Sequence, residues 1–147
     1  MKRKRILVVE DNSVDELLTM RALKQCNMAD AVQMAKDGDE ALEYLFATGK
    51  YEERDVNDLP EIVILDLKLP TISGLEVLER IRENESTKLL PVIILTSSDQ
   101  EEEKIESYRL GANSFVRKPM QFSDFIMAVT KLGRYWLATS ESPFNTK

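Results

Sequence analysis

The sequence predicts one α/β domain, built as a parallel five-stranded sheet between two layers of helices. Three apolar runs that contain no polar residue, at residues 6–9, 62–65 and 92–95, are typical of strands buried on both faces. Each run is followed by a segment with helical spacing of apolar residues, and this alternation favours parallel strands joined by helices. A chain of 147 residues is also long enough to bury the core of one such domain.

Two weaker strands complete the predicted sheet. Residues 31–35 are less apolar and precede a turn at Asp37, so we expect them near an edge. Residues 114–117 form a short strand that ends before Lys118. With helices between all the strands, we predict the doubly wound order 2-1-3-4-5, which is the flavodoxin-like (βα)5 sandwich.

The helices are predicted from apolar periodicity and from residues that suit helix ends. Asn12 or Ser13 suits the cap of the first helix, Ser73 and Glu76 have the spacing of a capping box, and Asp99 suits the start of the fourth helix. The expected helices lie at residues 13–26, 40–48, 73–81, 99–111 and 123–137. The expected inner face of the first helix carries Val14, Leu17, Leu18, Ala22 and Cys26, with Cys26 as a small core residue.

Composition argues against several classes of protein. The net charge is −6, with 20 Lys plus Arg against 26 Asp plus Glu, so we expect no nucleic-acid partner. The basic run at residues 2–5 is interpreted as a solvated lead-in to the first strand, with a short anion patch as the alternative. No apolar run reaches the length of a membrane span, no secretory leader is present and only one cysteine occurs, so we expect a cytoplasmic protein with no membrane partner.

Four predicted strands end on residues that carry chemistry: Glu10 with Asp11, Asp66, Thr96 and Lys118. Alone, each has an ordinary explanation as a helix cap, a turn residue, a strand-end hydroxyl or a surface lysine. Because the carboxyl ends of parallel strands meet at one edge of a sheet, we expect these side chains to lie together. Crowded carboxylates repel unless a cation lies among them, and oxygen ligands without histidine favour Mg²⁺. A carboxylate beside Mg²⁺ and a lysine suits nucleophilic attack on phosphorus.

Four motifs at these strand ends are shared with a known family. They are Leu7-Val-Val-Glu-Asp-Asn12, Leu65-Asp-Leu-Lys-Leu-Pro70, Leu95-Thr-Ser97 and Gly111-Ala-Asn-Ser-Phe-Val-Arg-Lys-Pro119. With the spacing between them, they make residues 4–137 resemble the CheY-like receiver domain of two-component response regulators. The resemblance implies one receiver domain over residues 1–147, with a core at about 4–139, a tail at 140–147 and no output domain.

The resemblance also implies a metal site. Asp11 would bind Mg²⁺ directly, Asp66 would be a second ligand and Glu10 would act through a water molecule. The backbone carbonyl of Lys68 would complete the protein's share of the metal shell. Mg²⁺ is therefore the expected cofactor.

By the same resemblance, Asp66 is the expected phosphoacceptor. Thr96 and Lys118 would hold the phosphoryl oxygens, and Phe115 matches the aromatic switch residue that moves inward with Thr96. A plain core role is the alternative for Phe115, which lacks the hydroxyl that a tyrosine would offer. The identities of Lys68 and Ser98, at positions that tune the lifetime of the phosphoryl group in receivers, do not give that lifetime.

The function implied is that of a signalling switch. A sensor histidine kinase would supply the phosphoryl group from its phosphohistidine, since this chain has no histidine. The domain would catalyse only its own phosphorylation and dephosphorylation, so it is not expected to be a conventional enzyme. A downstream protein partner would read a two-state surface formed by the fourth and fifth helices and the strand between them.

Two further features bear on partners. The polar segment 49–59 is expected as a surface loop or a frayed extension of the preceding helix, and it is longer than in a minimal receiver. Together with residues 135–137, it is similar to single-domain receivers that partner phytochrome-type histidine kinases. The alternatives are an insertion without function and core packing of Trp136. The apolar face of the last helix suggests homodimerisation, with core packing as the alternative. Its residues are Phe125, Val129, Leu132 and Trp136.

Two functions from other classes are alternatives. An aspartate-nucleophile phosphohydrolase also forms an aspartyl phosphate, but it usually carries a second acid two residues after the nucleophile, where this chain has Lys68. A flavin-binding flavodoxin-like module would need a phosphate-cradling first loop. Here that loop is Glu10-Asp11-Asn12, which would repel phosphate.

Overall fold

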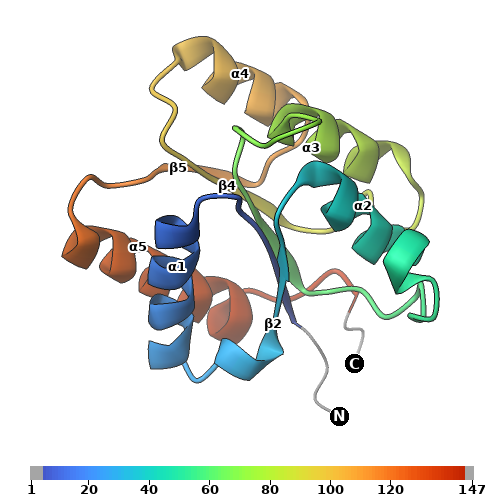
Figure 1. Ribbon diagram of the computed structural model, residues 1–147, viewed down its shortest axis with the longest axis horizontal. Helices are drawn as coiled ribbons and strands as arrows, with labels where there is room; N and C mark the ends of the chain where they lie inside the picture. Colours follow the sequence, from blue (N-terminus) through green and yellow to red (C-terminus); the bar gives the residue numbers. More distant parts are fainter. Residues whose placement is uncertain (1–4, 145–147) are drawn as a thin grey trace.

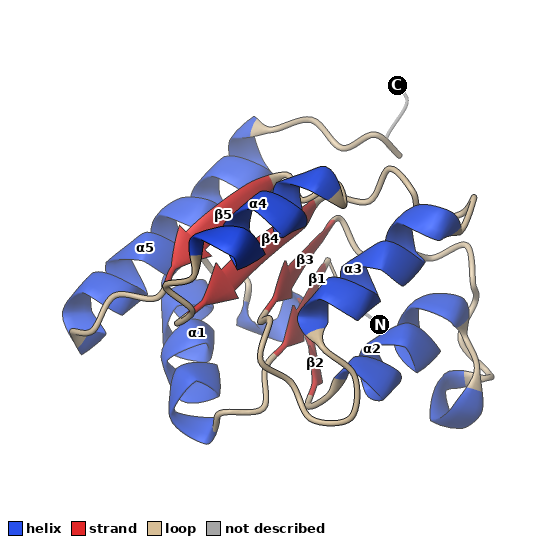
Figure 2. Ribbon diagram, turned by 90° about the horizontal axis from the view of Figure 1, so that it is seen from above, coloured by secondary structure: helices blue, strands red, loops and turns tan. Residues whose placement is uncertain are grey.

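The computed structural model describes residues 5–144 and contains the predicted parallel sheet. Five parallel strands lie in the order β2-β1-β3-β4-β5, as seen in Figures 1 and 2. Their bounds are β1 Ile6–Val9, β2 Val32–Ala35, β3 Ile62–Leu65, β4 Val92–Thr96 and β5 Ser114–Arg117. The flavodoxin-like fold class is therefore confirmed, with the weaker strand β2 at an edge as expected. Residues 2–4 of the basic run lie outside the described residues.

Helices cover both faces of the sheet (Figure 2). On one face lie α1 and α5, and on the other lie α2, α3 and α4. Their bounds are α1 Ser13–Gln25, α2 Gly38–Phe46, α3 Gly74–Glu83, α4 Glu101–Arg109 and α5 Phe122–Arg134, which continues into a π-helical turn at Tyr135–Thr139. Within residues 5–144, no helix is long and apolar enough to cross a membrane.

The central strands are buried on both faces, as their unbroken apolar runs predict. Because successive side chains of a strand point to opposite faces, β1 contributes Leu7 and Val9 to the core beneath α2 and α3, and Ile6 and Val8 to the core beneath α1 and α5. All four side chains are at most 2% exposed. Burial of these apolar groups on both faces stabilises the domain. It also fixes the position of each strand in the sheet, and therefore where the strand ends.

The register of the strands brings their carboxyl ends level. Val9 of β1 lies opposite Leu65 of β3, so the next residues, Glu10 and Asp66, emerge side by side. The amide of Asp66 donates to the Val9 carbonyl at 3.1 Å and continues the ladder. On the other side, the Lys118 amide donates to the Thr96 carbonyl at 2.7 Å. The strand-end residues therefore share one edge.

A close contact fixes the chain after Asp66. Gly74, the first residue of α3, lies so near that a Cβ atom there would be 2.2 Å from the Asp66 carbonyl oxygen. Its amide donates to the Leu67 carbonyl at 2.9 Å. Ser73 caps the helix by accepting from the Glu76 amide at 3.2 Å, as half of the predicted capping box. The start of α3 thus supports the loop that carries Asp66.

The predicted inner face of α1 is partly wrong. Leu18 and Ala22 are buried as predicted, but Val14 and Leu17 are 48% and 63% exposed. The buried face includes Thr19 and Leu23 instead, because α1 is turned so that this side meets α5 and the sheet. Cys26, expected in the core, is only partly buried at the C-terminus of α1.

Predicted helix starts differ from the structure by one or two residues. The second helix, α2, begins at Gly38 rather than Glu40, with Asp37 as its cap. The fourth helix, α4, begins after Gln100 rather than at Asp99, and no side-chain hydrogen bond caps it among the described residues. The last helix begins at Phe122 rather than Ser123. Helix ends are the least sharply specified part of a pattern, because local capping chemistry competes with tertiary contacts.

Most of the polar segment 49–59 lies on the surface, as predicted, but its last residue, Leu59, is buried in the core and the segment has fixed contacts. It contains a 3₁₀ turn at Gly49–Tyr51, and the Arg54 guanidinium donates to the carbonyls of Tyr44 at 2.7 Å and Leu45 at 3.1 Å. The same guanidinium lies 4.5 Å from the centre of the Tyr44 ring. Through these contacts, the charged side chain of Arg54 caps carbonyls in the last turn of α2. The segment therefore has a defined shape.

The apolar face of the last helix packs inside this domain. Phe125 and Val129 are buried, and Leu132 and Trp136 pack against the same core, which includes Leu137. Core packing, the alternative to homodimerisation, therefore accounts for the predicted face. The large apolar side chains exposed on this helix and its extension are others, namely Phe122, Met127 and Tyr135.

Candidate functional site

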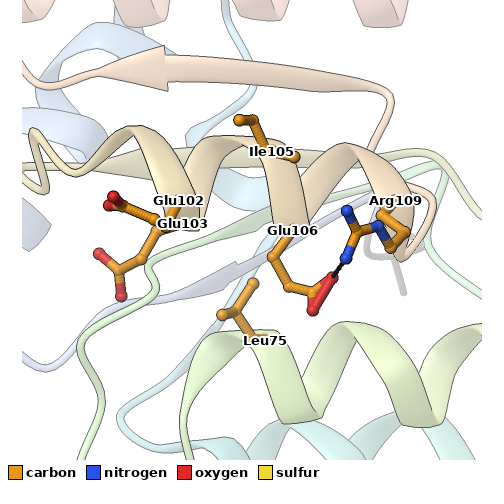
Figure 3. A pocket seen from close by; sticks show the side chains of 6 residues that line it. All are labelled: Leu75, Glu102, Glu103, Ile105, Glu106 and Arg109. Atoms are coloured by element: carbon orange, nitrogen blue, oxygen red, sulfur yellow. Dashed lines mark hydrogen bonds and ion pairs between the residues drawn. The ribbon is translucent and has the colours of Figure 1, made fainter.

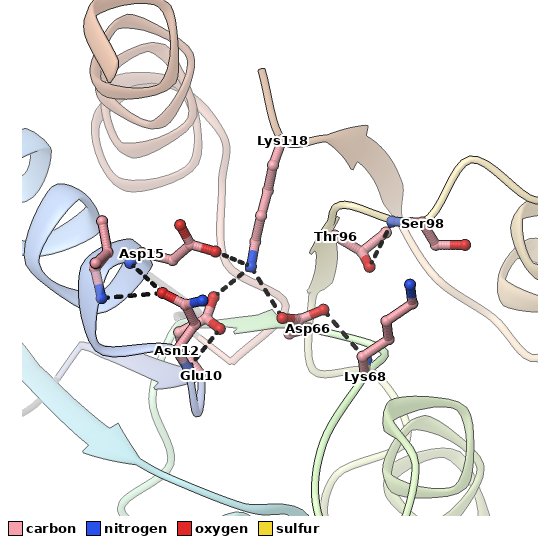
Figure 4. Close-up of polar contacts among 9 residues, drawn as sticks. Glu10, Asn12, Asp15, Asp66, Lys68, Thr96, Ser98 and Lys118 are labelled. Carbon is pink, nitrogen blue, oxygen red and sulfur yellow. Dashed lines mark hydrogen bonds and ion pairs between the residues drawn. The ribbon is translucent and has the colours of Figure 1, made fainter. Parts of the chain in front are cut away.

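A buried lysine lies at the centre of the carboxyl edge. The Nζ atom of Lys118 donates to three carboxylates, at 2.7 Å to Glu10, 2.7 Å to Asp15 and 2.9 Å to Asp66 (Figure 4). The lysine side chain is only 6% exposed. Burial of a charge is tolerated when it is paired and hydrogen-bonded, so this arrangement stabilises both the lysine and its acidic neighbours.

Three carboxylates form a group of the kind that holds a cation. One oxygen each of Glu10, Asp11 and Asp66 lies within 4.8 Å of the others. Glu10 and Asp66 are buried, whereas Asp11 is exposed at the rim, where an ion can reach it from solvent. Hard oxygen donors of this kind bind divalent cations such as Mg²⁺ or Mn²⁺. The three carboxylates that the sequence places at this edge are therefore close together.

Burial shifts the pKa of Glu10. Removal from water raises its pKa to about 7, and the hydrogen bond and charge of Lys118 offset this only in part. For Lys118 itself, burial lowers the pKa, but the hydrogen bonds to Asp15, Glu10 and Asp66 outweigh burial and hold the pKa above its usual value. Lys118 therefore stays positively charged at neutral pH, ready to bind anionic oxygens.

Thr96 and Lys68 flank Asp66 (Figure 4). Thr96 is fully buried at the end of β4, and its hydroxyl oxygen accepts from the Ser98 amide at 3.2 Å. The amide of Lys68 donates to Asp66 Oδ1 at 3.3 Å, while Lys118 takes Oδ2. Both oxygens of Asp66 are thus held, and the carboxylate has a fixed orientation.

Phe115 lies on β5, next to Val116, and away from the polar contacts around Asp66. It is partly buried and packs against the core on the α3 side of the sheet. The Arg117 guanidinium lies 6.0 Å from its ring centre and also donates to the Ser98 carbonyl at 3.3 Å. Arg117 thus connects this ring with the loop that follows Thr96.

Asp15 was missed as a site residue by the sequence reasoning. It belongs to the first turn of α1, where acidic residues suit the positive helix end. Its contact with Lys118 joins residues that are 103 positions apart. The available signal was its position: only three residues separate the end of β1 from the start of α1, so the first turn of α1 must lie at the same edge as Glu10.

The site opens to solvent through a polar hollow of about 530 Å³. Its walls are residues 11–15, Asp66, Lys68, Ser97 and Lys118. A second hollow, of about 520 Å³, lies between α3 and α4 (Figure 3). Part of its wall is apolar and is formed by Leu75 and Ile105. The acidic part is formed by Glu102, Glu103 and Glu106. The polar hollow, with its buried lysine and carboxylates, is the one suited to chemistry on an anionic group.

Comparison with known proteins agrees with this geometry. Residues 6–130 match the family model described as response regulator receiver domain. The probable methanogenesis regulatory protein FilR2 of Methanothrix harundinacea is 36% identical over 138 residues, which cover 94% of this chain and 86% of FilR2. Response regulator Rcp1 of Synechocystis is 34% identical over 138 residues, covering 94% and 92% of the two chains.

Solved structures give the same assignment. The phosphorylated cyanobacterial phytochrome response regulator RcpA has a TM-score of 0.89 at 33% identity, covering 97% of this chain and 99% of RcpA. The Mn²⁺-bound form of Rcp1 has a TM-score of 0.87 at 34% identity, covering 94% and 97%. The bacteriophytochrome response regulator AtBRR is 45% identical with a TM-score of 0.72, covering 96% and 100%. On sequence, fold and acidic edge together, this chain belongs to the response regulator receiver domain family.

Proposed function

We propose that the chain accepts a phosphoryl group on Asp66 from the phosphohistidine of a sensor histidine kinase. As a receiver domain it is a signalling switch rather than a conventional enzyme, and its family implies a histidine kinase partner. The observation that carries the assignment to Asp66 is its place in the site. Like Glu10, it is a buried carboxylate that joins the acidic group to the ammonium of Lys118, but of these two only Asp66 lines the polar hollow through which a donor can approach.

In the proposed reaction, an oxygen of Asp66 attacks phosphorus. The new O–P bond forms as the P–N bond of the phosphohistidine breaks, and the imidazole nitrogen leaves with the bonding electron pair. The carboxylate needs no activating base, since it is already an anion held by Lys68 and Lys118. Lys118 and Thr96 would then hold oxygens of the transferred group, which is the electrostatic stabilisation that phosphoryl transfer requires.

The cation that we propose for the acidic group is Mg²⁺. Asp11 and Asp66 would bind it directly, the Lys68 carbonyl would add a ligand and Glu10 would act through water. The oxygen-only donor set and the exposure of Asp11 support this, and the relative Rcp1 has been solved with Mn²⁺. When bound, the ion would offset charge on the transferring phosphoryl group.

The proposed response to phosphorylation passes through Thr96 and Phe115. Movement of the Thr96 hydroxyl toward the phosphoryl group would break its contact with the Ser98 amide and release the loop before α4. That helix suits a moving element, because Ser107 is its one buried residue. Ile105 and Tyr108 are half exposed on α4, and we propose that α4, β5 and α5 form the surface read by the downstream partner.

We further propose a phytochrome-type kinase as the phosphodonor. RcpA and AtBRR are named as phytochrome or bacteriophytochrome response regulators, and both cover nearly the whole described chain. The resemblance that the sequence shows at segment 49–59 and residues 135–137 supports the same donor. Association of two copies through the last helix also stays a proposal, and Phe122, Met127 and Tyr135 are the exposed apolar groups available for it. A monomer in analytical ultracentrifugation, both with and without a phosphoryl mimic, would refute the association of two copies.

Intact mass measurement tests the central proposal. Incubation with Mg²⁺ and acetyl phosphate should add one phosphoryl group that is stable in acid and labile in base, as expected for an acyl phosphate. Asp66→Asn should abolish the addition. Asp99→Asn, which neutralises an exposed aspartate in the loop before α4, should leave it unchanged. Equal labelling of the Asp66→Asn protein would refute the assignment.

The kinase proposal needs its own measurement. Phosphotransfer from a purified phytochrome-type kinase and from an unrelated histidine kinase should be timed at equal concentrations. A clear preference for the phytochrome-type donor is expected, and equal rates would contradict the proposed pairing without affecting Asp66 as the acceptor.

A further inference from the structure

The ammonium of Lys118 has no unused donor. An ammonium group carries three N–H bonds, and here three carboxylate oxygens accept them at 2.7, 2.7 and 2.9 Å. A phosphoryl oxygen therefore gains a hydrogen bond from Lys118 only when one of the three carboxylates gives up its own. Which carboxylate competes determines how readily the site accepts a phosphoryl group.

Asp15 is the carboxylate without another role. On the proposed function, Glu10 faces the cation and Asp66 becomes the phosphorylated group, so both have other partners during the reaction. Asp15 has no such assignment and remains a competitor for Lys118. Its side chain is 23% exposed, compared with 3% for Glu10, and it lines the hollow through which a donor must approach.

An anionic donor that enters this hollow meets the charge of Asp15. A free phosphodonor has little binding energy with which to offset that repulsion. A phosphohistidine carried by a protein is placed by the protein–protein contact, which supplies such energy from groups remote from phosphorus. A carboxylate at this position thus disfavours free donors more than protein-borne ones.

We propose that Asp15 is a specificity-determining residue that restrains phosphorylation of Asp66 by free anionic phosphodonors. It acts by its own charge beside the incoming group, from a position fixed by its hydrogen bond to Lys118. This inference rests on the proposed function, since it requires that Asp66 is the acceptor.

The test compares two small donors of different charge. Asp15→Asn keeps the size of the side chain and one acceptor oxygen but removes the charge. At saturating Mg²⁺ and near pH 7, acetyl phosphate is mostly a dianion and phosphoramidate mostly a monoanion. For a separation of about 7 Å in a water-like medium, Coulomb's law gives a rise of roughly sevenfold in the second-order rate constant for the first donor and roughly threefold for the second.

Screening by salt provides a readout that a purely structural role would not give. The gain in the Asp15→Asn protein should shrink as ionic strength rises from about 0.01 M to about 1 M, because the Debye length falls from roughly 30 Å to 3 Å. Glu16→Gln is the matched control. It removes one charge from the same helical turn but none of the hydrogen bonds of Lys118, so its rates should change much less. Asp15→Glu retains the charge and should stay within about twofold of the wild type, on the same Coulomb argument.

Three results would overturn the role of Asp15. They are an unchanged or lower rate in Asp15→Asn, a gain equal for both donors, and a gain that is insensitive to salt. The double variant Asp15→Asn with Asp66→Asn tests the role of Asp15 and the proposed function separately. If Asp66 is not the labelled residue, the proposed function fails and the role of Asp15 fails with it. If Asp66 is labelled but the rates do not follow donor charge, only the role of Asp15 fails.

Discussion

Replacement of Lys118 by methionine tests the electrostatic account of the site most directly. Methionine keeps the length and apolar stem of the side chain but removes the ammonium that three carboxylates share. Glu10 and Asp66 would then be left at 3% and 6% side-chain exposure without their cation. The metal-free protein should therefore lose stability at pH 8, which lies above the pKa of about 7 that burial gives Glu10.

The size of the effect follows from burial. Removing one partner from a buried, hydrogen-bonded ion pair typically lowers the free energy of unfolding by about 3–5 kcal/mol. Because Asp15 is partly exposed and water can enter the hollow, we expect a value near the lower end, about 3 kcal/mol. For a domain of this length, that corresponds to a melting temperature lower by roughly 6–12 °C.

The change should depend on pH with a definite sign. In the wild type, the raised pKa of Lys118 gives stability that is present below the unfolded value of about 10.5 and is lost above the folded value. In the variant, buried Glu10 loses the lysine that offsets its burial and favours the protonated form, so the folded state binds more protons than the unfolded state. Stability of the variant should therefore fall as pH rises from about 5 to about 8.

Thermal denaturation in the presence of a chelator, at pH 5 and pH 8, measures both effects. Lys88→Met is the control, since its pair with Glu85 is exposed and worth at most about 1 kcal/mol. Saturating Mg²⁺ should narrow the difference between Lys118→Met and the wild type, because the ion supplies positive charge to the same carboxylates. Equal melting temperatures for Lys118→Met and the wild type at pH 8 without metal would refute the electrostatic account.

Three further predictions concern other parts of the molecule. Gly74→Ala should lower the free energy of unfolding by about 1–3 kcal/mol and slow the labelling of Asp66, because the new Cβ would press on the Asp66 carbonyl; chemical denaturation and intact mass measure these. Burial and a hydrogen bond to Glu40 raise the pKa of Tyr51 to about 12, so stability should fall between about pH 10 and pH 12, and an ultraviolet titration should show one late tyrosine. Asp11→Asn should weaken the rise in melting temperature that Mg²⁺ produces, as calorimetry with and without Mg²⁺ would show.

Each of these has a control and a contrary result. Gly133→Ala, where a Cβ would meet the nearest atom at 3.3 Å, should be milder than Gly74→Ala, and the reverse order would contradict the contact at Asp66. Tyr51→Phe should reduce the late change in absorbance by the amount of one tyrosine, and an unchanged late absorbance would contradict the raised pKa of Tyr51. A full Mg²⁺ response in Asp11→Asn would exclude Asp11 as a ligand, with Asp99→Asn as the unaffected reference.

The strands and the strand-end residues were predictable because their signals are local. An apolar run without alternation specifies a strand buried on both faces, and the parallel arrangement then places every carboxyl end at one edge. That rule alone brought Glu10, Asp66, Thr96 and Lys118 together before any distance was known. It also gave the fold class, since helices between parallel strands leave few topologies.

Other features depend on how the elements pack, and no local pattern specifies them. Val14 and Leu17 have helical spacing with Leu18, yet they are exposed, because the rotation of α1 is set by its contact with α5 and not by its own sequence. The apolar face of the last helix suggested an interface between copies, whereas the sheet and α1 supply enough surface to cover it.

The chemistry of the site shows the same division. The sequence determined which carboxylates and which lysine lie at the edge, because strand ends carry them there. Only the tertiary structure decided that Asp15 joins Lys118 across 103 positions, and that burial raises the pKa of Glu10 to about 7. Hydrogen bonds and desolvation depend on distances of a few ångströms between separate elements, and these distances are fixed only when α1, β3 and β5 pack into one core.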